Sequence, residues 1–142
     1  MEDCIFCKII GRQEHAIVVY EDDHSIAFLD KYPLNPGHTL VLPKKHYAFM
    51  HEMPPEEVGR LFVSVAKVMR GVRKASKADG INIGQSNGRA ASQDVFHIHV
   101  HIIPRFNADS REGLGFPERK NTVLSDREQV GKLVKKAIEA EN

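Results

Sequence analysis

The chain has 142 residues, of which 20 are Lys or Arg and 19 are Asp or Glu, giving a formal net charge of +1. This length predicts one domain, the hydrophobic fraction of 42% argues against disorder, and the balanced charge argues against a nucleic-acid polymer as partner, since such binders carry a basic excess. No apolar run reaches the roughly 20 residues of a membrane helix and no signal peptide is evident, so we expect a cytoplasmic protein with no membrane partner.

The first half of the chain predicts one helical turn followed by three strands. The turn covers residues 8–12 and ends at Gly11. Two β-rich runs, 16–20 and 25–29, are separated by a polar turn, and a loop containing Pro and Gly leads into a third strand at 38–43.

A long helix after Pro54 is the clearest periodic pattern. Proline and two glutamates suit its first turn, and Asp79-Gly80 predicts a glycine C-cap at its end. Its apolar residues recur at the helical period. They are Val58, Leu61, Phe62, Val65, Val68, Met69 and Val72.

The second half predicts two more strands and a last helix. The strands are 81–86 and 95–103, and a polar loop at 106–124 follows. The helix covers 125–140 and begins at Ser125, where Ser-Asp-Arg-Glu matches a capping box. Five strands and two segregated helices predict a single α+β domain over residues 1–142, with a five-stranded antiparallel sheet and two main helices on one face.

Three histidines alternate along the last predicted strand. Because side chains of a strand alternate between faces, His97, His99 and His101 should share one face. The residues on the other face, Phe96, Ile98, Val100 and Ile102, should be core. Imidazole can act as nucleophile, proton donor or metal ligand, which favours a chemical site. A solvated polar face and a three-histidine metal site are the alternatives.

Two cysteines, Cys4 and Cys7, have the spacing of half a zinc site. A redox pair and two ordinary buried thiols are the alternatives. A redox motif would be expected after a strand in a βαβ unit, and the sequence around Cys4 has no such pattern.

The histidine-rich strand resembles the motif of the histidine-triad (HIT) family, His-x-His-x-His followed by two apolar residues. Other stretches match the family in the same order, so the resemblance covers roughly residues 4–105. The matching stretches are Cys4-Ile5-Phe6-Cys7-Lys8-Ile9, Ala27-Phe28-Leu29-Asp30, Gly37-His38-Thr39-Leu40-Val41-Leu42-Pro43-Lys44-Lys45-His46, Asn87-Gly88 and Phe96 to Ile103.

This resemblance implies a hydrolase or transferase that acts at the α-phosphate of a purine nucleotide conjugate, either a phosphoramidate or a dinucleoside polyphosphate. The nucleophile would be His99, forming a nucleotidyl-imidazole intermediate that water hydrolyses. His101 would bind the phosphate and assist proton transfer, and His38 would support the triad. A nucleotide-binding, zinc-stabilised interaction module with little turnover is the alternative function.

The resemblance also implies substrate-binding residues. Asp30 matches the acid that accepts hydrogen bonds from the ribose hydroxyls, although it could equally be a turn residue. Phe6, Ile9 and Phe28 match the apolar walls around the base, with core packing as the alternative. Asn87 and Gln93 match positions near the phosphate.

Three further expectations come from the family. Some prokaryotic zinc-containing members complete the zinc site with residues that are His46 and His97 here, which makes the zinc structural. A homodimer with a continuous sheet is implied. Asp94 departs from the usual pattern, which has a hydroxyl there, and a carboxylate beside a phosphate affects the choice of leaving group.

Overall fold

The computed structural model describes residues 3–109 and 116–142. The predicted loop at 106–124 therefore lies partly outside the described residues. The helices are α1 (Ile5–Ile10), α2 (Pro55–Ser76) and α3 (Leu124–Glu141), with short 3₁₀ turns at Met50–Glu52 and Arg89–Ala91. The strands are β1 (Val18–Glu21), β2 (Ser25–Leu29), β3 (Thr39–Pro43), β4 (Gly80–Gly84) and β5 (Val100–Arg105).

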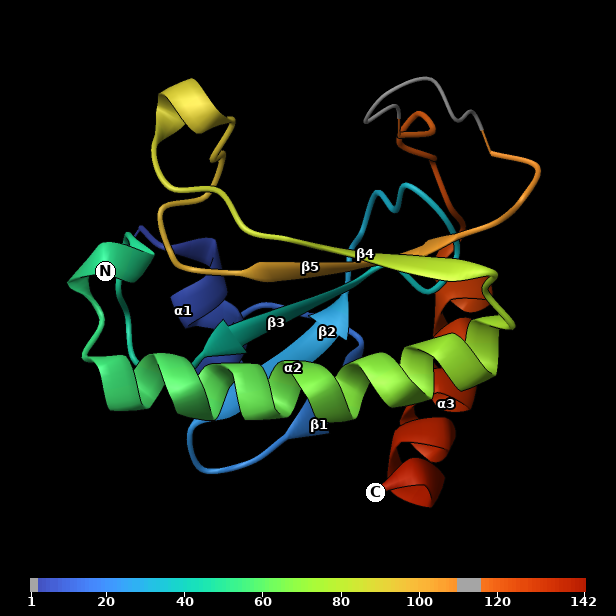
Figure 1. Cartoon of the computed structure of the whole chain (residues 1–142), viewed down its shortest axis with the longest axis horizontal. Coiled ribbons are helices and arrows are strands. Elements are labelled where there is room, and N and C mark those ends of the chain that lie inside the picture. The colour runs from blue at the N-terminus through green and yellow to red at the C-terminus, as the bar shows by residue number, and fades with distance from the viewer. Residues whose placement is uncertain (1–2, 110–115) are drawn as a thin grey trace.

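The five strands form one antiparallel sheet in the order β1-β2-β3-β5-β4. The long α2 crosses one face of this sheet together with α3, and α1 lies behind the opposite face (Figure 1). The α+β class, the antiparallel sheet and the two main helices are confirmed.

Strand β2 shows how the sequence builds two cores from one sheet. All five of its residues are buried. Ala27 and Leu29 pack with α2 and α3 in the larger core, while Ile26 and Phe28 pack with α1 residues in the smaller one. Burial on both faces explains why β2 reads as an unbroken apolar run rather than an alternating one.

Both long helices end differently from the sequence prediction. Helix α2 stops at Ser76, and Lys77 takes the left-handed conformation with φ of 56°, because Gly80 is already paired with Arg105 in β4. Helix α3 begins one residue before Ser125, and Val123 in extended conformation is its N-cap. No side-chain capping bond occurs at this end within the described residues, so the predicted capping box is wrong.

The histidine-rich strand is shorter than predicted, since β5 begins at Val100. Pro43, the last residue of β3, has no N–H to extend the ladder between β3 and β5, and its carbonyl accepts a hydrogen bond from the His97 ring instead. Alternation still holds for Ile98 and Val100, which are fully buried in the larger core. Phe96, expected in the core, is only half-buried and contacts Phe49 edge to face.

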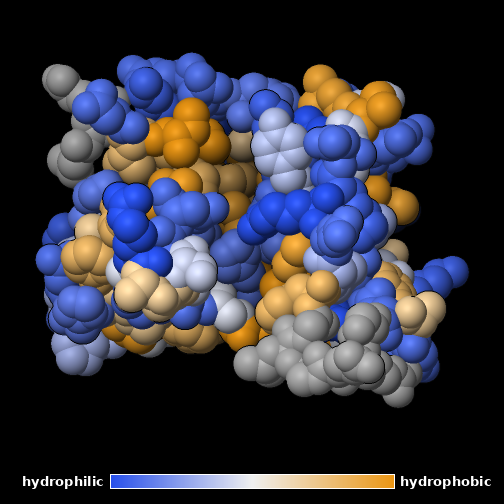
Figure 2. Space-filling view, turned by 90° about the horizontal axis from the view of Figure 1, so that it is seen from above, coloured by the Kyte–Doolittle hydropathy of each residue, from blue (hydrophilic) through white to orange (hydrophobic). Residues whose placement is uncertain are grey.

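The face seen from above is largely hydrophilic, with apolar residues gathered in separate patches (Figure 2). None of the described helices is long and apolar enough to cross a membrane.

Candidate functional site

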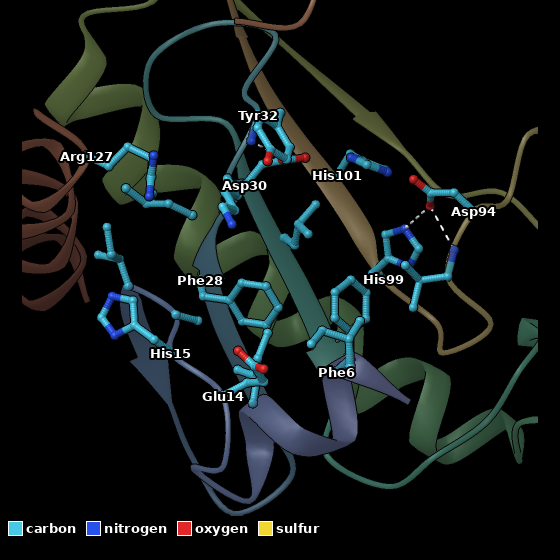
Figure 3. A pocket seen from close by; sticks show the side chains of 18 of the residues that line it. Phe6, Glu14, His15, Phe28, Asp30, Tyr32, Asp94, His99, His101 and Arg127 are labelled. Atoms are coloured by element: carbon cyan, nitrogen blue, oxygen red, sulfur yellow. Dashed lines mark hydrogen bonds and ion pairs between the residues drawn. The ribbon is translucent and has the colours of Figure 1, made fainter. Parts of the chain in front are cut away.

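A cavity of about 640 Å³ lies between α1, β2, the turn before β5 and the start of α3 (Figure 3). Apolar side chains of α1 and β2 form its floor, and histidines and acids lie around it. Its residues include Phe6, Ile9, Glu14, His15, Phe28, Asp30, Tyr32, Asp94, His99, His101, Arg119 and Arg127. The cavity thus combines an apolar wall with titratable groups, which is typical of ligand sites.

His99 lies at one end of this cavity with a defined tautomer. Its Nδ1 lies 2.8 Å from the carbonyl oxygen of His97, and because a carbonyl can only accept, Nδ1 carries the proton. In the neutral ring, Nε2 is then the nitrogen that has the lone pair, and it lies 3.6 Å from the Asp94 carboxylate, which also lines the cavity. The Phe6 ring packs edge-on at 5.1 Å and holds the imidazole in place.

His38 and His101 form a hydrogen-bonded pair next to His99. The Leu34 amide donates to His38 Nδ1 at 3.0 Å, so the His38 proton must be on Nε2, which donates to His101 Nδ1 at 2.9 Å. His101 then keeps its own proton on Nε2. Burial lowers the pKa of both His38 and His101 to about 4, so both rings are neutral near pH 7.

Asp30 follows β2 and reaches the same cavity. Its side chain is buried, and Oδ1 accepts from the Tyr32 amide at 2.9 Å. Oδ2 accepts from Arg119 at 3.0 Å and lies 3.6 Å from His38 Nε2. The carboxylate is therefore held between a turn amide and a guanidinium. Asp30 is thus both a turn residue and an acid that lines the cavity.

Phe6 and Ile9 of α1 and Phe28 of β2 form the apolar wall. The two phenylalanine rings meet edge to face at 5.5 Å. All three residues belong to the smaller core and also line the cavity. Core packing and a ligand-facing surface are thus combined in the same side chains.

The turn before β5 presents only one of its three predicted residues to the cavity. Asp94 lines it, with Oδ1 3.6 Å from His99 Nε2 (Figure 3). Gln93 is buried and bonds Gly88, Ala48 and Val95 through its amide, which fixes the turn. Asn87 is exposed, accepts from the Met50 amide and, among the described residues, lies outside the cavity lining.

The four residues predicted as metal ligands come together at the other side of α1. Cys4, Cys7, His46 and His97 each offer a donor atom within 4.8 Å of the others. The Nδ1 atoms of His46 and His97 are 3.2 Å apart. Cys7 Sγ lies 3.3 Å from the Nδ1 of His46 and 3.6 Å from that of His97, and Cys4 Sγ lies 3.6 Å from the Nδ1 of His97. These residues could hold a metal ion.

The surroundings of this cluster favour metal binding. His97 Nε2 donates to the Pro43 carbonyl at 2.8 Å, which turns the Nδ1 lone pair toward the cysteines. Burial lowers the pKa of His97 to about 4, so that lone pair is free of a proton near pH 7. Burial and the neighbouring Cys4 raise the pKa of the Cys7 thiol to about 11, and a bound cation would reverse that shift.

Sequence reasoning missed Arg119, Arg127, Tyr32 and His15 as cavity residues. His15, Tyr32 and Arg119 are exposed, and all four lie outside the motifs. Arg119 comes from a polar, aperiodic stretch where no sequence pattern signals a site. Only the fold places it next to Asp30.

Several known proteins are similar to this chain in sequence. The chain is 50% identical over 123 residues to an uncharacterized HIT-like protein of Methanocaldococcus jannaschii, covering 87% of this chain and 94% of that protein. It is 42% identical to the adenylylsulfatase HINT3 of Arabidopsis thaliana, over 75% of this chain and 54% of that one. It is 36% identical to the adenosine 5'-monophosphoramidase HNT1 of Saccharomyces cerevisiae, over 95% of this chain and 80% of that protein.

Solved structures are similar over almost the whole chain. A hypothetical histidine triad nucleotide-binding protein from Sulfolobus tokodaii strain7 matches with a TM-score of 0.88 and 40% identity, covering 96% of this chain and 93% of that one. A Zn-bound histidine triad family protein from Mycobacterium smegmatis matches with a TM-score of 0.86 and 38% identity, covering 99% and 96%. The model of the HIT domain matches residues 11–108, and the chain therefore belongs to the HIT family.

Proposed function

We propose that the protein is a nucleotide hydrolase or transferase that cleaves at the α-phosphate of a purine nucleoside monophosphate conjugate. The observation that carries this proposal is the tautomer of His99, whose Nδ1 proton is bonded to the His97 carbonyl while Nε2 has its lone pair on the cavity side. A nucleophilic imidazole needs this arrangement. Two relatives named as an adenylylsulfatase and an adenosine 5'-monophosphoramidase support an adenine nucleotide conjugate as the substrate class.

The reaction has two steps. His99 Nε2 forms a bond to phosphorus, and the bond from phosphorus to the leaving group breaks. An amine leaving group takes a proton from solvent as it leaves, and the enzyme retains a nucleotidyl-imidazolium. Water then attacks phosphorus and loses a proton to solvent, and the bond from phosphorus to His99 Nε2 breaks. The nucleoside monophosphate leaves, and neutral His99 is regenerated.

His101 assists through the proton on its Nε2. The bond from His38 fixes that tautomer, so His101 donates a hydrogen bond to a phosphate oxygen as negative charge builds up there. Asp30 accepts hydrogen bonds from the ribose hydroxyls, and the side chains of Phe6, Ile9 and Phe28 contact the base. In this arrangement the nucleoside spans the apolar wall and its phosphate meets His99.

We propose zinc as the metal of the cysteine–histidine cluster. A tetrahedral zinc ion with bonds of about 2.05 Å to nitrogen and about 2.3 Å to sulfur gives edges of about 3.3 Å between nitrogens and about 3.6 Å from nitrogen to sulfur. The 3.2 Å and 3.3 to 3.6 Å separations fit those edges. Zinc there supplies a structural cross-link between α1 and the residues that precede β5, and the similar Zn-bound structure supports this role.

We also propose a homodimer with a continuous sheet. β4 is an edge strand, and the nearby apolar side chains Phe62 and Val63 of α2 and Ile83 of β4 are 38%, 58% and 40% exposed. Pairing of two copies along β4 and α2 would cover them. Size-exclusion chromatography with light scattering measures the molar mass in solution and tests this proposal. The mass of a monomer at all concentrations would contradict it.

The second candidate is a nucleotide-binding module with little turnover. One observation favours it: the Asp94 carboxylate lies 3.6 Å from the nucleophilic nitrogen and would repel an entering phosphate. The intact hydrogen bonds of His99 and His101 oppose it.

One experiment separates the two candidates. The protein is incubated with an adenosine phosphoramidate and, separately, with a diadenosine polyphosphate, and then quenched in alkali for mass spectrometry. Release of AMP together with an adenylyl adduct on the peptide that contains His99 supports the enzyme. Binding of both nucleotides without product supports the module.

A further inference from the structure

Arg119 precedes α3 and contacts the carboxylate that the proposed function assigns to the ribose. Its Nη1 donates to Asp30 Oδ2 at 3.0 Å and to the Tyr32 carbonyl at 2.7 Å. The Tyr32 amide donates back to Asp30 Oδ1 at 2.9 Å. The three residues form a closed ring in which each carboxylate oxygen has one protein donor on it.

We propose that Arg119 is a positioning residue that fixes the Asp30 carboxylate for the ribose diol and so sets a preference for ribonucleotides over deoxyribonucleotides. A carboxylate oxygen offers about two lone-pair directions, so one protein donor on each oxygen leaves one direction on each for a ribose hydroxyl. The hydrogen-bonded ring of Arg119, Asp30 and Tyr32 fixes the orientation of the carboxylate and therefore of both unoccupied lone pairs. This inference rests on the proposed function, since it requires a nucleoside in the cavity.

The position of His38 shows what Arg119 prevents. Asp30 Oδ2 lies only 3.6 Å from His38 Nε2, which already donates to His101. While Arg119 bonds Oδ2, its guanidinium is the charge partner of the carboxylate. Without Arg119, the carboxylate would turn toward the His38 N–H, which lies 3.6 Å from Oδ2, and away from the ribose.

The segment around Arg119 has its own attachments to the turn after β2. The Lys120 amide donates to the Pro33 carbonyl at 2.9 Å, and its ammonium donates to the Leu34 carbonyl. Loss of the Arg119 guanidinium therefore leaves the segment in place. Lys120 holds the same turn without touching Asp30, which makes it a matched control.

The test compares turnover of adenosine 5'-phosphoramidate with that of its 2'-deoxy analogue by the wild type, Arg119→Gln, Arg119→Lys and Lys120→Gln. Arg119→Gln should lower the ratio of kcat/KM values, ribo over deoxy, by about tenfold, because hydrogen bonds to a charged acceptor are among the strong ones. The loss should appear in KM, with kcat within about twofold. Arg119→Lys should recover part of the ratio, and Lys120→Gln should keep it.

The outcomes separate this inference from the proposed function. If the wild type turns over the ribonucleotide and Arg119→Gln keeps the wild-type ratio, or if Lys120→Gln lowers the ratio equally, the positioning role is overturned while the proposed function stands. If the wild type prefers the ribonucleotide over the deoxyribonucleotide, and only the Arg119 variants lower that ratio of kcat/KM values, the role is supported. Absence of nucleotide binding and turnover in the wild type would overturn the proposed function, and this inference with it.

Discussion

His38 Nε2 lies 2.9 Å from His101 Nδ1, and this contact fixes the protons of both rings. The Leu34 amide determines the tautomer of His38, and His38 determines that of His101. His101 then keeps its proton on Nε2 and lines the cavity beside His99. A backbone amide in a turn thus sets the hydrogen-bonding character of a triad histidine two residues from His99.

His99→Ala should abolish turnover while the fold remains. Loss of a nucleophile that forms a covalent intermediate typically costs at least about a thousandfold in kcat. The protein should still melt cooperatively and bind AMP, since the apolar wall and Asp30 are intact. A variant with wild-type kcat would show that another group attacks phosphorus.

The stability of the protein should fall as the pH drops from about 6.5 toward about 4, partly because of His38. The unfolded imidazole takes up a proton near its ordinary pKa, while burial holds the pKa of the folded one at about 4. Between those values the unfolded state binds more protons, so stability is lost on acidification, by up to about 1.4 kcal/mol per pH unit for one imidazole.

His38→Gln isolates this contribution. Glutamine can accept from the Leu34 amide and donate to His101 but does not titrate. Unfolding in urea from pH 7 to pH 4.5 should give a shallower loss for the variant than for the wild type. Parallel curves would mean that His38 does not carry the effect.

The sequence predicted those parts of the molecule whose signal is local. Alternation placed Ile98 and Val100 in the core, and β2 was predicted with its observed bounds. The contact of Arg119 with Asp30 joins residues 89 positions apart, with no periodic pattern at either end. Such a contact depends on where a loop returns to the sheet, which local propensity does not encode. The late start of β5 at Val100 similarly depends on its pairing with another strand, β3, which ends at Pro43.

Removal of metal should destabilise the protein. A chelator should lower the melting temperature by on the order of 10 °C, as expected for loss of a tightly bound native-state ligand. Cys7→Ser should melt lower without chelator and respond little to it. Purified protein that contains no zinc and melts at the same temperature with chelator would contradict the structural zinc site.

Gly71 of α2 should tolerate no side chain, because a Cβ there would lie 2.6 Å from the Ile138 nitrogen and 2.7 Å from its Cα in α3. We expect Gly71→Ala to destabilise the fold by about 2 kcal/mol or more. Gly59 lies in the same helix with no described atom within 4 Å of its added Cβ. Gly59→Ala should therefore stabilise by about 0.5 to 1 kcal/mol. Equal effects in denaturant melts would refute close α2–α3 contact at Gly71.

Under the proposed hydrolase function, Asp94 should favour amine leaving groups over anionic ones. Its carboxylate lies 3.6 Å from His99 Nε2, on a side chain that is 71% exposed and so is free to face the scissile bond. A departing amine gains positive charge as it takes up its proton, which a carboxylate stabilises. Sulfate or phosphate gains negative charge, which the carboxylate opposes.

Asp94→Ser should therefore raise kcat/KM for adenylyl sulfate and diadenosine polyphosphate by about tenfold, the size expected for two charges about 5 Å apart at a partly solvated site. The value for an adenosine phosphoramidate should stay level or fall. Asp23→Ser in the turn between β1 and β2 removes the same charge far from the cavity and serves as the control. If both substrate classes change by the same factor in Asp94→Ser, the carboxylate does not discriminate between leaving groups. If Asp23→Ser reproduces the shift, net charge rather than the position of Asp94 is responsible.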